Sequence, residues 1–207
     1  MFKCITRQDS IAVSEGMKKG MAKKKITIVG DGESGKTSLI NRFAHGGFND
    51  DNYLPTVTEI TVENVEYGQK AVELNIQDTA GQESYGTLRP ISYPGTDVIV
   101  VCFSIDNIAS LENVSLNWVP EIRHFCGAVT IVLVGTKSDV RDTLMCGSNS
   151  NFLKHGPLKY EDGCAMAYRI NAVTYLECSS KSDKGIEEVF HAAIKASLSK
   201  PKKKRLF

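Results

Sequence analysis

A glycine-rich loop near the N-terminus constrains this chain more than any other feature. Residues 30–37 read GDGESGKT and fit G-x-x-x-x-G-K-[ST], between an apolar run at 26–29 and a helix expected from residue 36. In that context successive backbone N–H groups converge on an oligophosphate, Lys36 reaches the outer phosphates, and the Thr37 hydroxyl binds Mg²⁺. The loop therefore predicts a nucleoside triphosphate as the ligand.

A second pattern overlaps the first. The three glycines of the loop also satisfy G-x-G-x-x-G, and Asp50 and Asp51 lie about the right distance downstream for a ribose-binding acid. A dinucleotide loop needs no ammonium or hydroxyl directly after its last glycine, whereas a triphosphate–Mg²⁺ site needs both. The pair Lys36-Thr37 therefore favours the triphosphate.

Length and composition suit one folded domain. The chain has 207 residues, of which 42% are hydrophobic, enough for a single core. No apolar run approaches the roughly 18 residues of a membrane span, and the N-terminus is too polar for a signal peptide, so we expect a cytoplasmic protein. The six cysteines include no C-x-x-C pair and have no histidine at ligand spacing, which predicts neither zinc nor disulfides.

Positive charge is concentrated at the two ends of the chain. Residues 1–25 carry seven Lys or Arg against two acids, and residues 195–207 carry six against none. We expect 1–22 to be a disordered leader, 23–198 the folded domain and 199–207 a polybasic tail. The tail has no cysteine among its last four residues, so a prenylation box is absent; truncation, electrostatic membrane attachment and a nuclear import signal remain as alternatives.

Apolar patterns alternate between strands and helices along the folded part. We expect a loop with irregular helix from 83 to 92, a kink at Pro120, and a loop or irregular insertion over 142–157. The predicted strands are 24–29, a hairpin of 60–65 and 72–76, 97–103, 130–134 and 174–177. The predicted helices are 36–45, 110–125, 160–170 and 186–198. This alternation predicts an α/β doubly wound fold, with a mostly parallel six-stranded sheet, one antiparallel edge strand and helices on both faces. The glycine-rich loop at 30–37 makes a P-loop NTPase the expected form of this fold.

Two further motifs follow predicted strands, where ligands of such sheets bind. An acid at Asp78 can hold Mg²⁺ through water, and the N–H of Gly81 can approach a γ-phosphate. The carboxylate of Asp139 can accept two hydrogen bonds from the edge of guanine, while the stem of Lys137 lies over the ring. Adenine lacks that donor pair, and a buried unpaired carboxylate costs several kcal/mol. Asp139 therefore predicts selection of guanine.

Taken together, the motifs resemble those of the Ras-like small GTPases, and within them the Rho/Rac group. The resemblance covers about residues 24–198. It includes YLPTV from Tyr53, DTAGQE from Asp78 followed by LRPISYP, WVPEI from Trp118, GTKSD from Gly135 and ECSSK from Glu177. Thr136, where most Ras relatives have asparagine, is itself Rho-like. The family's fold, known as a G domain, is thus expected over residues 23–198.

The resemblance implies a role for each matching residue. The N–H of Gly81 would contact the γ-phosphate, and Gln82 would orient the attacking water. Phe48 would pack edgewise on guanine, and Ser180 would offer its backbone N–H to the guanine oxygen. The implied catalytic residues are Lys36, Thr56 and Gln82, and the implied metal ligands are Thr37, Thr56 and Asp78. The implied nucleotide contacts are Gly30, Asp31, Gly32, Glu33, Ser34, Gly35, Lys36, Thr37, Ser38, Phe48, Tyr53, Pro55, Thr56, Asp78, Gly81, Thr136, Lys137, Asp139, Ser179, Ser180 and Lys181.

The resemblance also implies a partner-controlled switch that cycles between GTP and GDP with Mg²⁺. No arginine lies between Arg42 and Arg89, so the segment around YLPTV, the first switch of the family, supplies no arginine finger, and unaided hydrolysis should be slow. Exchange factors, GTPase-activating proteins, dissociation inhibitors and effectors, the last in actin signalling, would bind through 48–62 and 81–94. We expect a cytoplasmic monomer that binds no nucleic acid. Contact of the basic tail with an anionic membrane, at the cytoplasmic face of the plasma membrane, is one of the alternatives given above for that tail, and a nuclear location is the less favoured one.

Several residues depart from the family pattern. Glu33 and Ser34 replace a small residue and valine usual in Rho loops, although the same GESGK sequence occurs in heterotrimeric G-protein α subunits. Thr58 stands where an aromatic is common, and Gln77 replaces a tryptophan typical before the DTAG motif. These changes leave open a hydrolysis-deficient guanine-nucleotide-binding scaffold as the alternative. Trp118 is interpreted as a core residue rather than a functional one.

Overall fold

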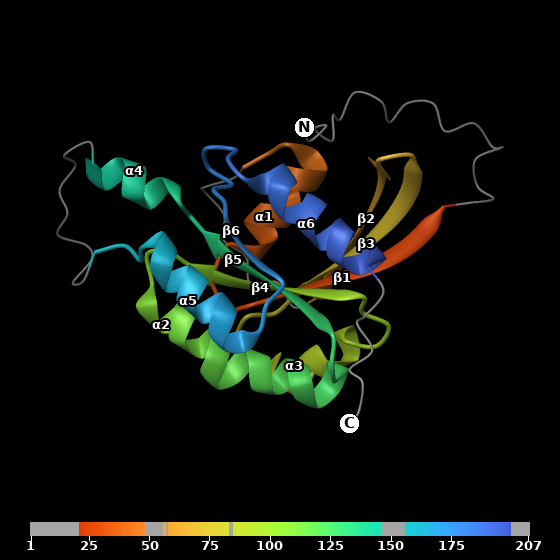
Figure 1. Ribbon diagram of the computed structural model, residues 1–207, viewed down its shortest axis with the longest axis horizontal. Coiled ribbons are helices and arrows are strands. Elements are labelled where there is room, and N and C mark those ends of the chain that lie inside the picture. Colours follow the sequence, from red (N-terminus) through yellow and green to blue (C-terminus); the bar gives the residue numbers. More distant parts are fainter. Residues whose placement is uncertain (1–20, 49–55, 57, 83–84, 146–155, 200–207) are drawn as a thin grey trace.

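The computed structural model describes residues 21–48, 56, 58–82, 85–145 and 156–199, with the side chains of 143–145 excluded. Its strands form one six-stranded sheet in the order β2-β3-β1-β4-β5-β6 (Figure 1). All neighbouring strands are parallel except β2 and β3, so β2 is an antiparallel edge strand. The strands are β1 (Ala22–Val29), β2 (Thr58–Tyr67), β3 (Lys70–Thr79), β4 (Val98–Ser104), β5 (Thr130–Thr136) and β6 (Thr174–Glu177). The predicted sheet is confirmed.

Helices cover both faces of the sheet, as predicted. Figure 1 shows α1 and α6 on one face, and α2, α3 and α5 on the other. The helical segments are α1 (Lys36–His45), the 3₁₀-helix η4 (Arg89–Ser92), α2 (Ile108–Asn113), the π-helix η5 (Val114–Trp118), α3 (Val119–Cys126), α4 (Asp139–Met145), α5 (Tyr160–Ile170) and α6 (Ile186–Leu198). β1 begins at Ala22, the last residue assigned to the leader from sequence.

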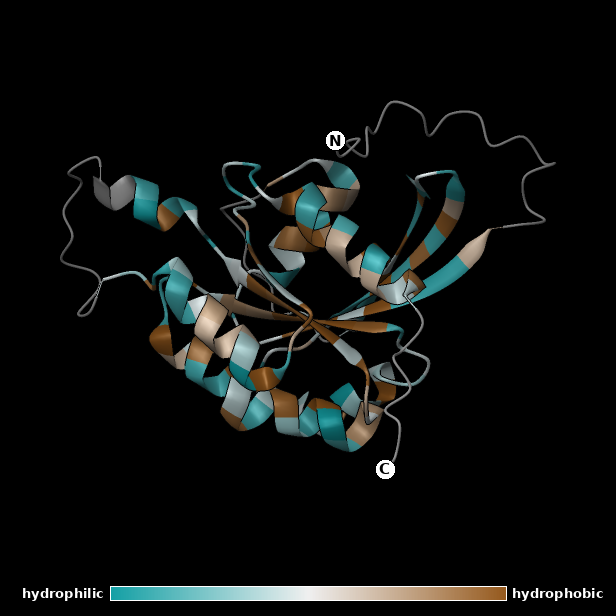
Figure 2. Ribbon diagram, in the orientation of Figure 1, coloured by the Kyte–Doolittle hydropathy of each residue, from teal (hydrophilic) through white to brown (hydrophobic). Residues whose placement is uncertain are grey.

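Two hydrophobic clusters hold the helices against the sheet. All seven residues of β4 are buried, because helices cover this strand on both sides. Ile28 of β1 and Phe190 of α6 belong to the cluster on one face, while Phe103 of β4 and Trp118 belong to the other. Figure 2 shows the most hydrophobic colouring on the central strands. The core thus fixes the ends of β1, β4 and β5, where the glycine-rich loop at 30–37 and the GTKSD motif at 135–139 begin.

The helix predicted from residue 110 differs from the prediction. It begins at Ile108, and its middle turn is a π-helix rather than an α-helix with a kink at Pro120. Proline has no N–H to donate to a carbonyl of the preceding turn. The N–H of Val119 instead donates to the carbonyl of Val114, five residues back, which widens the turn directly before the proline.

The predicted loop over 142–157 is also partly wrong, because α4 continues to Met145. Its first turn is held by hydrogen bonds from Val140 to Lys137 and from Arg141 to Ser138. Arg141 then pairs with Glu177 at the end of β6, with nitrogen–oxygen distances of 2.5 and 2.9 Å. This ion pair fixes α4 beside the sheet. Among the described residues, no helix has the length and apolar content needed to cross a bilayer.

Candidate nucleotide-binding site

Residues 30–37, called the phosphate loop from here on, connect β1 to the start of α1. Gly30 has a φ of 145°, and a Cβ at this position would lie 2.1 Å from the carbonyl oxygen of Cys102 in β4. Gly35 has a φ of 80° and is the N-cap of α1. Only glycine adopts such conformations without steric cost, so the backbone path of the loop requires these two residues. Glu33 is exposed and also has a positive φ, of 61°.

The side chain of Lys36 folds back over the phosphate loop. Its ammonium donates to the carbonyl oxygens of Gly30 at 2.9 Å and Asp31 at 2.6 Å, and only 6% of the residue is exposed. Burial lowers the pKa of Lys36, while the neighbouring Cys102, Asp78 and Asp31 act in the opposite direction. A buried ammonium above a glycine-rich loop is suited to bind phosphate oxygens.

A group of oxygen atoms beside Lys36 fits Mg²⁺. The hydroxyl of Thr37 donates to Asp78 Oδ2 at 2.6 Å and lies 2.9 Å from the hydroxyl of Thr56. Asp78 is 3% exposed, and its Oδ1 is buried without a hydrogen-bond partner. Burial raises the pKa of Asp78, although Thr37 and Lys36 favour its ionised form. An unpaired carboxylate oxygen beside two hydroxyls is the oxygen-rich donor set that Mg²⁺ prefers.

The structure thus brings together all three residues predicted as metal ligands. One detail differs from the sequence prediction, because Asp78 lies inside β3, which ends at Thr79, rather than after the strand. The carboxylate therefore projects from the sheet itself. No cluster of three or more His, Cys, Asp or Glu side chains suited to a metal occurs among the described residues.

Gly81 and Gln82 lie against the phosphate loop. A Cβ at Gly81 would come within 2.4 to 2.5 Å of backbone atoms of Asp31 and Gly32, so the close approach of the two segments requires glycine. The Cγ of Gln82 would lie 3.6 Å from a Cβ at Gly32, and Gln82 is exposed. The expected water-orienting side chain therefore stands at the open side of the loop.

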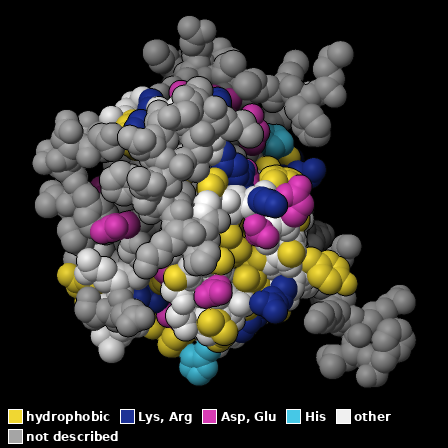
Figure 3. Space-filling model, turned by 90° about the vertical axis from the view of Figure 1, so that its left-hand side faces the viewer, with side chains coloured by type: hydrophobic (Ala, Val, Ile, Leu, Met, Phe, Trp, Pro, Cys, Tyr) yellow, Lys and Arg dark blue, Asp and Glu magenta, His cyan; other side chains and the backbone are white. Residues whose placement is uncertain are grey.

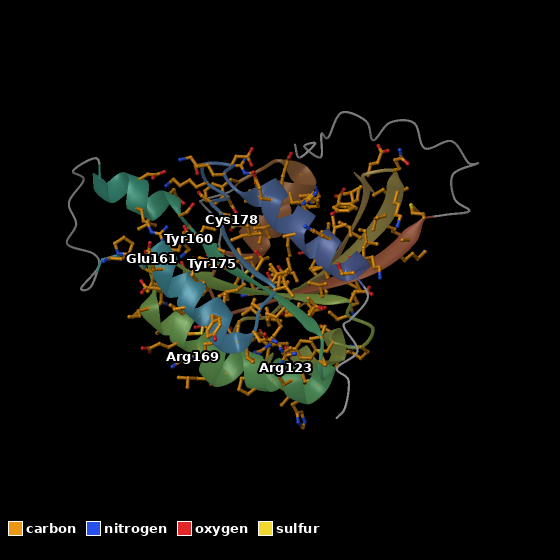
Figure 4. The ribbon with its side chains drawn as sticks, viewed as in Figure 1. Arg123, Tyr160, Glu161, Arg169, Tyr175 and Cys178 are labelled. Carbon is orange, nitrogen blue, oxygen red and sulfur yellow. The ribbon has the colours of Figure 1, made fainter. Side chains whose placement is uncertain are left out.

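The predicted guanine-binding residues meet at the ends of β5 and β6. The hydroxyl of Ser179 donates to Asp139 Oδ1 at 2.6 Å. Lys137 has a φ of 59°, and its ammonium lies 3.3 Å from Asp106 Oδ2. Figure 4 labels Cys178, which directly precedes Ser179 and has a thiol whose pKa is raised by burial. The base motifs therefore form one cluster.

Thr136 connects this cluster to the phosphate loop. Its hydroxyl lies 2.6 Å from the carbonyl oxygen of Ser34 and 3.0 Å from that of Phe103, both buried. A Cβ at Gly35 would touch the same threonine at 3.4 Å. The residue that the sequence marked as Rho-like therefore joins the phosphate and base halves of the site.

Of the other predicted nucleotide contacts, some lie in or directly after α1, and two lie outside the described residues. Phe48 follows α1, and its ring centre lies 5.9 Å from the guanidinium carbon of Arg42. Ser38 is half-buried in the first turn of α1. Tyr53 and Pro55 lie outside the described residues.

Two residues that sequence reasoning did not assign to the site hold Asp31 of the phosphate loop. The indole N–H of Trp118 donates to Asp31 Oδ1 at 2.6 Å, and the amide of Asn113 donates to Oδ2 at 2.7 Å. These donors are five residues apart, and an α-helix would place them on different sides. The π-turn between them, with its i→i+5 repeat, brings them to one side. Trp118 is 4% exposed, so it is both a core residue, as predicted, and a neighbour of the loop.

Arg89 links this π-turn to Gln82. Its guanidinium carbon lies 4.3 Å from the centre of the Trp118 ring, and its nitrogens donate to the carbonyls of Ala80 at 3.0 Å and Gln82 at 3.2 Å. It also pairs with Glu121 at 2.7 Å. A cavity of about 610 Å³ opens beside this network, and it is lined by Asp31, Gly32, Gly81, Gln82, Gly86, Arg89, Asn113, Asn117, Trp118 and Glu121. In the sequence, the only signals for this network were the short runs LRP at 88–90 and WVPE at 118–121.

This fold and site define a P-loop nucleotide-binding protein of the α/β class. A sequence model of the Ras family matches residues 25–199. The chain is 48% identical over 178 residues to the Rho-related GTP-binding protein RhoB of Homo sapiens, which covers 86% of this chain and 90% of the relative. RhoB of Mus musculus and of Rattus norvegicus match to the same extent. The chain belongs to the Ras family, and it is a Rho-family small GTPase. The alternative of a hydrolysis-deficient scaffold is not favoured.

Proposed function

We propose that this site binds GTP and GDP together with Mg²⁺, and that the residues described above carry out slow hydrolysis of GTP. The observation that carries the proposal is the buried Asp78 oxygen without a partner, beside the hydroxyls of Thr37 and Thr56 and close to a buried Lys36. Leaving a buried carboxylate oxygen unpaired is costly, and a cation would remove that cost.

Thr37, Thr56 and Asp78 would hold the metal, with Asp78 acting through water. When bound, Mg²⁺ supplies charge neutralisation at the phosphates. Lys36 adds a second positive charge, and its present partners, the carbonyls of Gly30 and Asp31, show that its ammonium already points over the loop. The chain's own residues thus bind and orient the triphosphate.

Gln82 would orient the attacking water, and the N–H of Gly81 would contact the γ-phosphate. The contact of Gly81 with the phosphate loop supports this role, because it fixes that backbone where a γ-phosphate would project. The exposure of Gln82 leaves the site open to a partner. An arginine supplied by an activating protein could raise hydrolysis by roughly 10³- to 10⁵-fold.

Thr56 and Gly81 would make the site a switch. Each belongs to a segment that we propose contacts partners, residues 48–62 and 81–94. Contacts of these two residues with the metal and γ-phosphate would order both segments, and loss of the phosphate would release them. The hydroxyl of Thr56 already lies within 2.9 Å of Thr37, which supports a direct link to the metal site.

Asp139 would select guanine, with Lys137 over the face of the base, Phe48 at its edge and the N–H of Ser180 on its oxygen. The bond from Ser179 to Asp139 supports this assignment, because it orients the carboxylate beside the end of β6. Replacing Asp139 with Asn should shift preference from guanine to xanthine nucleotides. Unchanged GTP affinity in that variant would refute the assignment of Asp139.

We propose that regulators and effectors bind through the two switch segments. Ile91 is 74% exposed, and Leu88 and Ile60 are also exposed, which provides hydrophobic contact area. Figure 3, which views the side where α4 lies, shows acidic, basic and hydrophobic side chains interspersed among the described residues. The tail and the cytoplasmic location stay predictions.

Chelation of the metal tests the proposal directly. We expect EDTA to accelerate GDP release from the wild-type protein strongly, because the phosphates lose their main counter-charge. The Asp78→Ala variant should release GDP rapidly with or without EDTA. Asp142→Ala, which removes an exposed carboxylate from an ion pair with Lys184, is the matched control and should behave like the wild type. A rate of GDP release from the wild-type protein that EDTA does not change would contradict the metal assignment.

A further inference from the structure

Arg42 lies in the middle of α1 and reaches the base side of the site. Its Nε donates to the carbonyl oxygen of Ser180 at 2.7 Å, its Nη2 to that of Lys181 at 3.4 Å, and its Nη1 to that of Gly46 at 2.8 Å. Its side chain is 15% exposed. One guanidinium therefore holds carbonyls from two segments that are distant in sequence.

Both segments belong to the proposed base pocket. Ser180 is the residue expected to offer its N–H to the guanine oxygen, and Gly46 ends α1 two residues before Phe48. The ring centre of Phe48 lies 5.9 Å from the Arg42 guanidinium carbon. The exposed carboxylate of Asp183 lies 3.7 Å from Nε and adds a weak ion pair on the solvent side.

The same helix begins at the phosphates. Lys36 and Thr37 occupy its first turn, and Arg42 lies further along it, so α1 connects the phosphate site to the base loop through a rigid element. Arginine suits this position because its planar fork presents several donors in fixed directions. A lysine would carry all of its donors on one nitrogen, so it would lack the spread planar fork with which Arg42 binds carbonyls of two segments.

We infer that Arg42 is a positioning residue for guanine recognition, which sets the place of the Ser180 N–H and of the Phe48 ring and so slows nucleotide release. The inference rests on the proposed base site. It goes beyond that proposal because it assigns control of the base contact to a residue on the phosphate-binding helix. Arg42 need not touch the nucleotide to exert this control.

The test compares GDP with two analogues that are each changed at one position of the base: inosine diphosphate lacks the 2-amino group, and 6-thioguanosine diphosphate is changed at position 6. GDP and inosine diphosphate both carry the C6 oxygen, whereas 6-thioguanosine diphosphate replaces it with sulfur, a weaker acceptor, and keeps the two donors for Asp139. Arg42→Met keeps the apolar stem but removes the guanidinium. We expect it to speed release of GDP and inosine diphosphate by about 10- to 100-fold, because hydrogen bonds to charged groups are lost. The fold-increase in the release rate of 6-thioguanosine diphosphate should be at least five times smaller than the fold-increase for GDP.

Two controls separate positioning from general stability. Arg42→Lys should also speed GDP release, since it restores charge but not the fork. Arg123→Met removes an arginine that likewise binds two loop carbonyls, of Gly127 and Val129, but lies on α3, across the sheet from Cys178 (Figure 4). We expect Arg123→Met to leave all three release rates unchanged.

The outcomes distinguish the inference from the proposed function. Equal acceleration for all three nucleotides in Arg42→Met, or no acceleration of GDP release, would overturn the role of Arg42 while leaving the proposed GTPase intact. A wild-type protein that binds GDP but does not prefer it to 6-thioguanosine diphosphate would overturn the role of Ser180 and with it the inference. Failure of the wild type to bind GDP at all would instead contradict the proposed function.

Discussion

Replacing Trp118 with Phe should destabilise the protein through the loss of one hydrogen bond to the phosphate loop. The indole N–H donates to Asp31 Oδ1 at 2.6 Å, while Asn113 binds the other oxygen and is left in place by the substitution. A hydrogen bond to a charged group contributes about 1.5–3 kcal/mol. Asp31 is only half-buried, so water can replace part of that contribution, and we expect about 1–2 kcal/mol from this bond.

A double-mutant cycle isolates this bond from the packing of the ring. Urea unfolding would be followed by circular dichroism for the wild type, Trp118→Phe, Asp31→Ala and the double variant, at one fixed saturating concentration of GDP and Mg²⁺. Circular dichroism is needed because Trp118 is the only tryptophan of the chain. A coupling free energy of about 1–2 kcal/mol is expected. Coupling below about 0.5 kcal/mol would refute the argument that the π-turn holds the loop through this bond.

Two further perturbations test other parts of the structure. Asp78→Asn should stabilise the nucleotide-free protein at neutral pH, because burial raises the pKa of Asp78 and its ionisation therefore opposes folding. This destabilisation is absent below the unfolded pKa of about 3.8 and develops as the pH rises through the folded pKa of Asp78. The difference in melting temperature between variant and wild type should therefore widen from acid to neutral pH. A difference that does not change with pH would contradict this prediction. Gly163→Ala should cost about 1–3 kcal/mol in urea unfolding, because a Cβ there would lie 2.0 Å from the ring of Tyr175, whereas Gly47→Ala, with no atom within 4 Å, should be nearly neutral.

The regular elements could be predicted because their patterns are local. The apolar repeat of α6 gave the same bounds, Ile186–Leu198, that the structure has, and α1 likewise runs from Lys36 to His45 as predicted. The β-branched run of β4 indicated a strand covered on both faces, which is what the structure shows. In each of these elements burial on a periodic face dominates the energetics, so sequence pattern and fold agree.

The elements that were missed depend on single interactions. The α4 helix is short, and its contact with the sheet comes from the pairing of Arg141 with Glu177, 36 residues away. The π-turn depends on the missing N–H of Pro120, and a proline alone does not distinguish a kink from a widened turn. Neither feature leaves a periodic signal in the sequence.

The candidate site likewise contains residues that the sequence predicted and contacts that it did not predict. Its motif residues were predicted because each motif is a short segment with its own chemistry, as in Lys36 and Asp139. The contacts that position those residues join distant segments: Trp118 and Asp31 are 87 residues apart, and Arg42 and Ser180 are 138 apart. Such pairs become visible only when the fold brings their segments together.

Single-turnover hydrolysis tests the central claim, that this site is a GTP switch in which Gln82 orients the attacking water. Protein loaded with GTP and Mg²⁺ would be followed with and without a Rho-type activating protein, beside the Gln82→Leu variant. We expect slow hydrolysis alone, roughly 10³- to 10⁵-fold acceleration by the activating protein, and almost none in the variant, whose GTP affinity should be unchanged. Absence of acceleration in the wild type, with the variant hydrolysing GTP at the same rate, would contradict the account.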